Sequence, residues 1–285
     1  MVVSMSYKFD AKIYKMRSQD LRVTNYSENE LLRHFNEIGM SERRSYCHTD
    51  TASEYYSSCY LRGQGIEIGA GKNPIKLMGN ARCEYGDIAE HALFDSDNLK
   101  IKKIIVNLNS KINSDLKIVN KYDFVVAQHV LEHCDSMVRS LSVLRNLCKS
   151  GGVIYISLPN KNFDKDSKWI RQYGLMHHIA EYFVPRFFSD DHKKNYIKEV
   201  TNAVLSSGGE DYQGSEVVST AMQEEILKGN IPHEHEYLYH KHSYSLEGWL
   251  HLLLKLNALF KIGIELIDCG FGLDRNDCHF VFLAK

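Results

Sequence analysis

The sequence predicts an α/β fold, in which helices alternate with the strands of a mostly parallel sheet. Residues 122–130 (YDFVVAQHV) contain an unbroken apolar run, which is typical of a strand buried on both faces of such a sheet. Residues 65–71 (GIEIGAG) have the pattern of a short strand that ends in a glycine turn. A helical pattern over 136–148 ends at Ser150-Gly151-Gly152, and an apolar strand follows at 153–159. This alternation indicates a doubly wound sheet.

Four more strands complete the predicted sheet. Residues 81–88 and 102–109 would form the second and third strands, and residues 262–271 and 278–285 would form the last two. A helix over 245–259 precedes this closing pair. Its apolar side consists of Leu246, Trp249, Leu250, Leu253 and Leu256.

The chain divides into four parts by composition. Residues 1–60 are polar with short amphipathic pieces, and they would form a helical N-terminal segment. Residues 61–160 carry the alternating pattern of the core, and residues 245–285 return to it. Residues 161–244 lie between them, are rich in Lys, Asp, His and Tyr, and would form an inserted lid region. We therefore expect one core domain with an insertion.

The N-terminal segment contains a helix that begins after Ser27. Ser27 is a suitable N-cap, and Glu30 occupies the third helical position of a capping box. The apolar residues that follow at helical spacing are Leu31, Leu32, Phe35 and Ile38. We expect these four side chains to share one face of the helix.

Composition narrows the functional class. The 285 residues include 35 Lys and Arg and 36 Asp and Glu, for a net charge of −1. The chain as a whole therefore has no excess of positive charge that would argue for nucleic acid or an anionic membrane as a partner, although a local basic cluster is left open. No apolar stretch is long enough for a signal peptide or a membrane span. The seven cysteines are scattered without a CxxC pair, so we expect reduced thiols in a cytoplasmic protein and no structural zinc site.

The glycine turn after the first strand carries the strongest local signal. Gly69 and Gly71 give only G-x-G, because the third glycine of a dinucleotide-binding fingerprint is missing. Glu67, two residues before the turn, would repel a pyrophosphate and attract an ammonium group. Both departures argue against an NAD-dependent oxidoreductase and favour a ligand without phosphates.

Asp87 and Gln128 stand at the predicted carboxyl ends of two further strands, where ligands of open α/β sheets bind. Asp87 follows Gly69 by 18 positions, close to the spacing of about 20 at which an acidic residue accepts hydrogen bonds from ribose hydroxyls. Glu84 is the competing carboxylate, but it lies within the strand. We therefore prefer Asp87 as the ribose ligand.

Four segments resemble, in order and spacing, the motifs of class I S-adenosylmethionine-dependent methyltransferases. They are EIGAGKNP, YGDI, YDFVVAQHVLEH and KSGGVIYISLPN. The resemblance covers residues 61–160 and 245–285. It implies an enzyme with a Rossmann-like, seven-stranded, mostly parallel sheet and an antiparallel C-terminal strand. It also implies S-adenosylmethionine as the cofactor and S-adenosylhomocysteine as the product.

The resemblance implies a set of cofactor residues, namely Glu67, Gly69, Ala70, Gly71, Asp87, Ile88, Asn107, Leu108, Gln128 and His129. The first four would hold the methionine portion and the ribose. Asp87 would bind the ribose hydroxyls, with Ile88 against the adenine. Asn107 and Leu108 would flank the adenine, although Asn107 departs from the acidic residue that the family often has there. The last two residues of the set would lie beside the sulfonium through their backbone groups.

A narrower resemblance points to the acceptor. SLPNKNFDKD, HHIAEYF and HKHSYSLEGWLHLL are similar to a subgroup found with bacterial surface-polysaccharide and glycosyltransferase genes. It implies O-methylation of a sugar or sugar-linked group. Asn160, Lys161 and Asp164 follow the fifth predicted strand and would line the acceptor pocket, with a solvated loop as the alternative. N-methylation of a small amine and a non-catalytic S-adenosylmethionine-binding partner subunit are the alternatives. The expected partner is a small-molecule or saccharide acceptor, and a homodimer is left open.

Methyl transfer to a hydroxyl needs a proton acceptor, and histidine is the usual general base near neutral pH. His129 and His133 lie four positions apart and would share one face at the start of a helix, with His133 toward the substrate. His242 directly precedes the predicted C-terminal helix. We rank His133 and His242 as candidate bases, followed by His178. A capping or core role for His133 is the alternative.

The insertion also contains alternating histidine and glutamate residues over 233–242 (HEHEYLYHKH). Such a run could ligate a divalent metal. A solvated polar loop is the more common explanation for a run of this composition. We therefore assign no metal ligands from the sequence.

Overall fold

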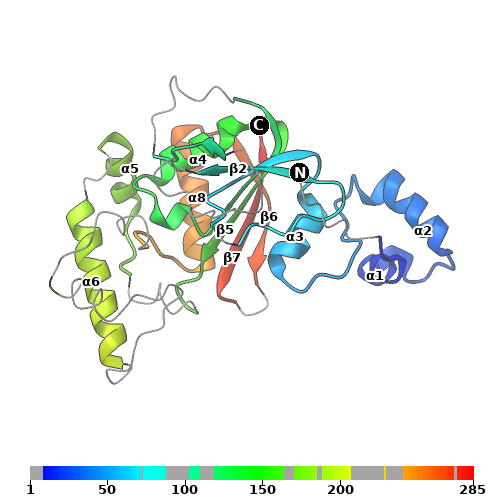
Figure 1. The fold of residues 1–285 in the computed structure, drawn as a ribbon, viewed down its shortest axis with the longest axis horizontal. Helices are drawn as coiled ribbons and strands as arrows, with labels where there is room; N and C mark the ends of the chain where they lie inside the picture. Colours follow the sequence, from blue (N-terminus) through cyan, green and yellow to red (C-terminus); the bar gives the residue numbers. More distant parts are fainter. Residues whose placement is uncertain are drawn as a thin grey trace.

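The computed structural model describes residues 9–71, 73–87, 103–109, 119–163, 170–184, 188–206, 228, 240–272 and 275–285. A seven-stranded sheet forms the centre of the molecule, with helices on both of its faces (Figure 1). The inserted lid region that we expect over 161–244 is described only in parts.

The sheet has the strand order β3-β2-β1-β4-β5-β7-β6. Its strands are β1 (Gln64–Ile68), β2 (Arg82–Asp87), β3 (Lys103–Ile105), β4 (Tyr122–Gln128), β5 (Cys148–Pro159), β6 (Ile264–Phe271) and β7 (Asp277–Ala284). The first five strands pair in parallel, and β7 runs antiparallel to both of its neighbours. The predicted fold class is therefore confirmed. The largest differences in strand bounds are at β3, which is shorter than the predicted 102–109, and at β5, which begins at Cys148 and not at 153.

The middle of the sheet is buried on both faces, as the apolar run of β4 predicts. Val125 and Ala127 pack into one hydrophobic core, which α4 (Met137–Leu147) and α8 (Leu246–Phe260) cover. Phe124 and Val126 face the opposite core, which α3 (Ala52–Tyr60) covers. Figure 1 shows α3 on one side of the sheet and α4 and α8 on the other.

The last core helix closely matches its predicted bounds. Ser245 caps α8 by accepting a hydrogen bond from the backbone N–H of Gly248. Trp249, Leu253 and Leu256 are fully buried on its inner side. These residues attach α8 to the sheet.

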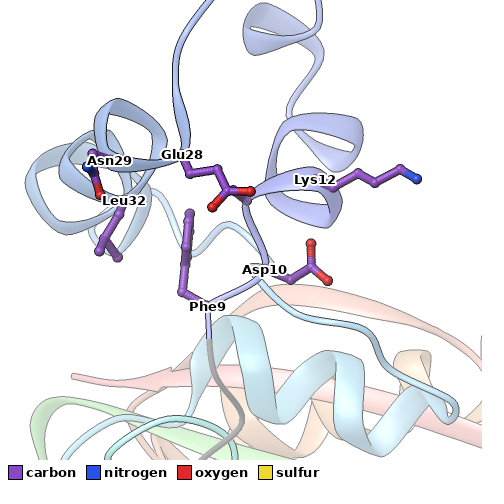
Figure 2. Close-up of a pocket in the computed structure, with 7 residues that line it drawn as sticks. Phe9, Asp10, Lys12, Glu28, Asn29 and Leu32 are labelled. Carbon is purple, nitrogen blue, oxygen red and sulfur yellow. The ribbon is translucent and has the colours of Figure 1, made fainter.

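Residues 9–47 pack around a small hydrophobic core that also includes Met78. This segment contains α1 (Ala11–Arg17), a 3₁₀ turn (Gln19–Leu21), α2 (Glu28–His34) and a π-helical turn (Phe35–Gly39). An open pocket between α1 and α2 is lined by Phe9, Asp10, Ala11, Lys12, Glu28, Asn29 and Leu32 (Figure 2). This pocket adjoins none of the predicted site residues.

The predicted capping box of α2 is confirmed, but its predicted shared face is wrong. Ser27 and Glu30 exchange hydrogen bonds with each other's backbone N–H groups. Leu31 is buried, whereas Leu32 and Ile38 are 39% and 40% exposed. Leu32 directly follows Leu31 and therefore lies about 100° around the α-helix from it. Ile38 lies within the π-helical turn, whose wider winding ends the regular helical spacing.

Two further sequence-based expectations concern the whole chain. All seven cysteines are free thiols. None of the described helices is both long enough and apolar enough to cross a lipid bilayer.

The parts of the insertion that the structure describes include two helices. They are α5 (Leu175–Phe183) and α6 (Ser189–Ser206). Figure 1 shows both on the side of the molecule opposite α1 and α2. The segment 240–244 then leads into α8 and forms a bridge from Tyr244 to Asn160, directly after β5. The insertion therefore returns to the sheet at the carboxyl end of β5.

Candidate functional site

The glycine turn has one closed side and one open side. Gly69 has a φ of +66°, and a Cβ at this position would lie 2.7 Å from Cγ2 of Val130. Gly71 has a φ of +51°, and a Cβ there would meet no atom within 4 Å. Gly69 also donates a backbone hydrogen bond of 2.9 Å to the carbonyl of Gly86 in β2. The turn thus packs against Val130 at Gly69 and leaves open space at Gly71.

Asp87 lies beside this turn. Ile68 pairs with Gly86 in the register of β1 and β2, so Asp87 is the next residue along, level with Gly69. Asp87 is half-buried, and its backbone carbonyl accepts a hydrogen bond of 3.0 Å from Val106. The structure therefore brings the predicted ribose ligand to the glycine turn. Ile88, the predicted adenine contact, lies outside the described residues.

Glu67 is fully buried beneath the turn. Its two carboxylate oxygens accept hydrogen bonds of 3.1 and 2.9 Å from the backbone N–H of Ile75, and Gln128 Nε2 donates to Oε1 at 3.0 Å. Burial raises the pKa of Glu67 to about 7, although these hydrogen bonds oppose the rise. The structure thus brings together Glu67 and Gln128, which the sequence predicts on separate strands.

Ser53 belongs to the same network, and sequence reasoning missed it. Its hydroxyl donates to Gln128 Oε1 at 2.8 Å and accepts a hydrogen bond of 3.2 Å from the hydroxyl of Tyr155. Ser53 lies in the first turn of α3. The sequence offers no local signal for it, because the contact joins residues 75 positions apart.

The buried carboxyl of Glu67 predicts a pH-dependent stability. The folded protein holds this proton with a pKa of about 7, against 4.5 for an ordinary glutamate. The contribution of Glu67 to the free energy of unfolding therefore falls as the pH rises from about 4.5 to about 7, and it is constant at higher pH. In Glu67→Gln the dependence is absent. When the pH is raised from about 5 to about 8, we expect the free energy of unfolding of the variant to rise by about 2.5 kcal/mol relative to that of the wild type.

Urea unfolding of both proteins across this pH range measures the difference. Because all other titrating groups are shared, they cancel in the comparison. A stability difference that stays constant with pH would show that Glu67 titrates normally in the folded protein.

The predicted adenine contacts after β3 differ in exposure. Asn107 is exposed, and its side-chain oxygen accepts a hydrogen bond of 2.9 Å from the backbone N–H of Asn109. Leu108 is 5% exposed and packs into the core beneath α4. Asn107 therefore lies on the surface, whereas the side chain of Leu108 serves the core.

His129 stands at the tip of β4 in a left-handed conformation with a φ of +51°. Its backbone N–H donates to the carbonyl of Ser157 at 3.0 Å. Its ring lies 3.2 Å from a carboxylate oxygen of Asp277 and 3.4 Å from one of Glu132. Burial would lower the pKa of His129, but hydrogen bonds to these carboxylates outweigh it and raise the pKa to about 10. The two carboxylates therefore favour the protonated form of His129, which argues against it as the general base.

The expected helical face of His129 and His133 is wrong. Leu131–His133 forms a single 3₁₀ turn, not the start of an α-helix. Both rings instead lie near Oε1 of the fully buried Glu132, with His129 Nδ1 at 3.4 Å and His133 Nε2 at 3.9 Å from it. Burial alone would raise the pKa of Glu132, but the nearby imidazoles hold it below its usual value. The side chain of His133 is 21% exposed, and its ring lies 4.8 Å from that of His240.

The other two candidate bases lie in a closed cluster. His242 and His178 are both fully buried, and both face Glu181 of α5. Burial lowers the pKa of His178 to about 4. His178 Nε2 also lies 2.7 Å from the hydroxyl of Tyr244. Of the three candidate bases, His133 is therefore the one whose side chain is partly exposed.

The side chains of the two residues that follow β5 make hydrogen bonds to the backbone of other segments. Asn160 is 1% exposed, and its side-chain amide donates to the carbonyl of Arg275 at 3.0 Å. The ammonium of Lys161 bonds to the carbonyl of Ile170. Neither side chain is free to line a pocket as expected, and Asp164 lies outside the described residues.

Comparison with known proteins places the middle of the chain in a described family. A family model described as a methyltransferase domain matches residues 47–199. No curated protein matches the sequence.

Several solved structures are similar to the chain. The CurJ carbon methyltransferase is 14% identical with a TM-score of 0.41, and the match covers 96% of this chain and 57% of that one. The CMeT domain of the citrinin polyketide synthase is 10% identical with a TM-score of 0.38, and the match covers 97% and 60%. This chain therefore spans less than two thirds of either protein.

A third similar structure matches over most of both chains. It is a Thermotoga maritima S-adenosylmethionine-dependent methyltransferase, described as a possible histamine N-methyltransferase. It is 14% identical with a TM-score of 0.42, and the match covers 90% of this chain and 95% of that one.

Proposed function

Because this chain belongs to the methyltransferase domain family, whose cofactor is S-adenosylmethionine, we propose that it methylates an oxygen of a sugar or sugar-linked group. The reaction would serve surface-polysaccharide biosynthesis in the cytoplasm. The acceptor class rests on the resemblance of 157–166, 177–183 and 240–253 to the polysaccharide-associated subgroup.

The arrangement of the strand ends carries the proposal. The glycine turn of β1, Asp87 of β2 and the β4 tip at Gln128 lie side by side on adjacent strands. This is the edge at which open α/β sheets bind ligands. The space at Gly71, which a Cβ would enter without contact, fits a ligand that approaches the backbone closely. Asp87 would bind the ribose hydroxyls, and the region above Glu67 would hold the methionine portion.

S-adenosylmethionine supplies a methyl group on a sulfonium sulfur. The acceptor oxygen forms a bond to this methyl carbon as the carbon–sulfur bond breaks, and its proton must leave. His133 would accept that proton, a role supported by its position in the turn that follows β4 and by its partly exposed side chain. Glu132 would stabilise the resulting imidazolium from its buried position. Positioning of the two reactants would supply much of the remaining rate enhancement.

The variant His133→Asn tests this assignment. We expect kcat to fall about 100-fold, because general-base catalysis contributes at least this much, while the affinity for S-adenosylhomocysteine stays unchanged. His251→Asn, on the exposed side of α8, is the matched control and should keep wild-type activity. An unchanged kcat in His133→Asn would remove His133 as the base.

The acceptor is identified by incubating the protein and methyl-labelled cofactor with sugar nucleotides, free sugars and small amines. Label on a sugar oxygen supports the proposal. Label on an amine would replace it with N-methylation. Binding of S-adenosylhomocysteine without transfer to any of these acceptors would favour a non-catalytic partner subunit.

A further inference from the structure

Four buried side chains from three separate segments meet at one point beside the β4 tip. His177 and Glu181 lie one helical turn apart on α5, His192 lies in the first turn of α6, and His242 precedes α8. They are 7%, 1%, 3% and 0% exposed, in that order. One ligand atom from each lies within 4.8 Å of every other. The arrangement therefore gathers three imidazoles and one carboxylate in a space closed to solvent.

The distances within this cluster match those between the ligands of one small metal ion. Oε1 of Glu181 lies 2.9 Å from Nε2 of His177, 3.2 Å from that of His242 and 3.5 Å from that of His192. Nε2 of His177 lies 3.2 and 3.4 Å from the same atoms of His192 and His242. Zinc bonds of about 2.0–2.1 Å at tetrahedral angles separate ligand atoms by roughly 3.3–3.4 Å. The cluster already has nearly this size.

Hydrogen bonding among the four residues does not account for these contacts. Each neutral imidazole carries a proton on only one of its nitrogens, so the three Nε2 atoms hold three protons at most. These atoms and the carboxylate oxygen make five close contacts. At least two of the contacts therefore have no proton between the two atoms and are not hydrogen bonds, which is unfavourable for polar atoms held this close in a buried space.

The surroundings fix the orientation of the imidazoles. The ring of His177 is held between Tyr173, with ring centres 3.8 Å apart, and Phe188, with ring centres 4.1 Å apart. The backbone N–H of His242 is bonded to the carbonyl of Glu132 at 3.2 Å. The ring of His177 therefore cannot turn freely, and the backbone bond holds the 242 position of the chain next to it.

We propose that His177, Glu181, His192 and His242 bind one Zn²⁺ ion. Three neutral imidazole nitrogens and one carboxylate oxygen are zinc ligands, and four protein ligands complete a tetrahedron without an open position for water. The ion therefore serves to hold α5, α6 and the 240–244 segment together. The single charge of Glu181 would be compensated by the ion in a region where burial otherwise disfavours it.

This zinc site would also position the proposed catalytic turn. The backbone N–H groups of Lys241 and His242 both donate to the carbonyl of Glu132, at 2.8 and 3.2 Å. Glu132 directly precedes His133. The zinc ligand is thus joined by its own peptide group to the turn that carries the candidate base. The metal site itself does not depend on whether the protein transfers methyl groups.

Metal content and spectroscopy of the purified full chain test the proposal without measuring activity. After removal of metal by a chelator and dialysis, titration with Zn²⁺ should show one tight site per chain and raise the melting temperature. Replacement by Co²⁺ should give the intense visible absorption of a tetrahedral site. Absence of a stoichiometric site, or a Co²⁺ spectrum typical of octahedral coordination, would overturn the proposal.

Two variants locate the site. His192→Asn removes one ligand, and we expect its affinity for Zn²⁺ to be at least tenfold lower than that of the wild type. Zn²⁺ should then no longer raise the melting temperature of this variant. His251→Asn removes an exposed histidine from α8 and should bind Zn²⁺ as the wild type does. Equal affinity in His192→Asn and wild type would place the metal elsewhere and overturn the assignment. If His192→Asn does not fold, the Co²⁺ spectrum of the wild-type chain still decides.

Discussion

Asp87→Ala should bind S-adenosylhomocysteine roughly 1,000-fold more weakly than the wild-type protein. The expected loss follows from removing a carboxylate that accepts two hydrogen bonds from the ribose, each worth about 1.5–3 kcal/mol when one partner is charged. Each 1.4 kcal/mol corresponds to about tenfold in affinity. Isothermal titration calorimetry measures the dissociation constant directly. The fold should be retained, because Asp87 lies at the end of β2 and is half-buried.

Glu84→Gln is the matched control for this variant. Glu84 lies on the same strand, three residues earlier, and its carboxylate is bonded to the ammonium of Lys121 at 2.6 Å and to the hydroxyl of Tyr122 at 2.5 Å. These contacts engage it within the protein, so its replacement should leave the affinity for S-adenosylhomocysteine unchanged. The opposite result, with binding lost in Glu84→Gln and kept in Asp87→Ala, would assign the ribose to Glu84.

The second large effect is expected from Gly69→Ala. The new methyl group would lie 2.7 Å from Cγ2 of Val130 at a φ of +66°. A left-handed alanine costs roughly 1–2 kcal/mol, and forcing a methyl group into a packed site costs roughly 1–3 kcal/mol more. We expect a loss of about 2–5 kcal/mol in the free energy of unfolding, measured with urea.

Gly71→Ala separates the two causes. Gly71 shares the left-handed conformation, but its Cβ would meet nothing within 4 Å. Its stability should fall only by the cost of the conformation, while its affinity for the cofactor should fall because the methyl group enters the open space. The double variant Gly69→Ala/Val130→Ala should recover part of the stability lost in Gly69→Ala. Equal stability losses in Gly69→Ala and Gly71→Ala, without recovery in the double variant, would exclude the contact with Val130.

Most of the sheet could be predicted because its strands carry local patterns. The apolar run of β4 reflects burial on both faces, and its observed bounds lie within the predicted ones. Ser27 with Glu30 predicts the start of α2 in the same way, because a capping box involves only neighbouring residues. The predicted range of the third strand is too long, because the apolar pattern of 102–109 continues past the last residue of β3, Ile105, to the buried Val106 and Leu108.

The sequence predicts the position of a site residue only where that residue lies at the end of a strand. Glu67, Asp87 and Gln128 follow from the strand pattern, and the structure confirms that they stand at adjacent strand ends. The histidines could not be placed in this way. His177 and His242 meet across 65 positions of sequence, and nothing in either segment specifies the other. Their convergence depends on how α5, α6 and the 240–244 segment pack, which periodicity does not encode.

The antiparallel position of β7 has a consequence for how the chain is made. Tyr155 of β5 contacts His279 of β7 across 124 positions, so β5 is synthesised long before the second strand that pairs with it. Its residues from 152 to 159 are all buried in the finished sheet. Until β7 pairs with it, the apolar edge of β5 is open to pairing with strands of other chains. Conditions that delay completion of the chain should therefore favour aggregation through β5, even though the half of the sheet that contains the glycine turn can already have formed.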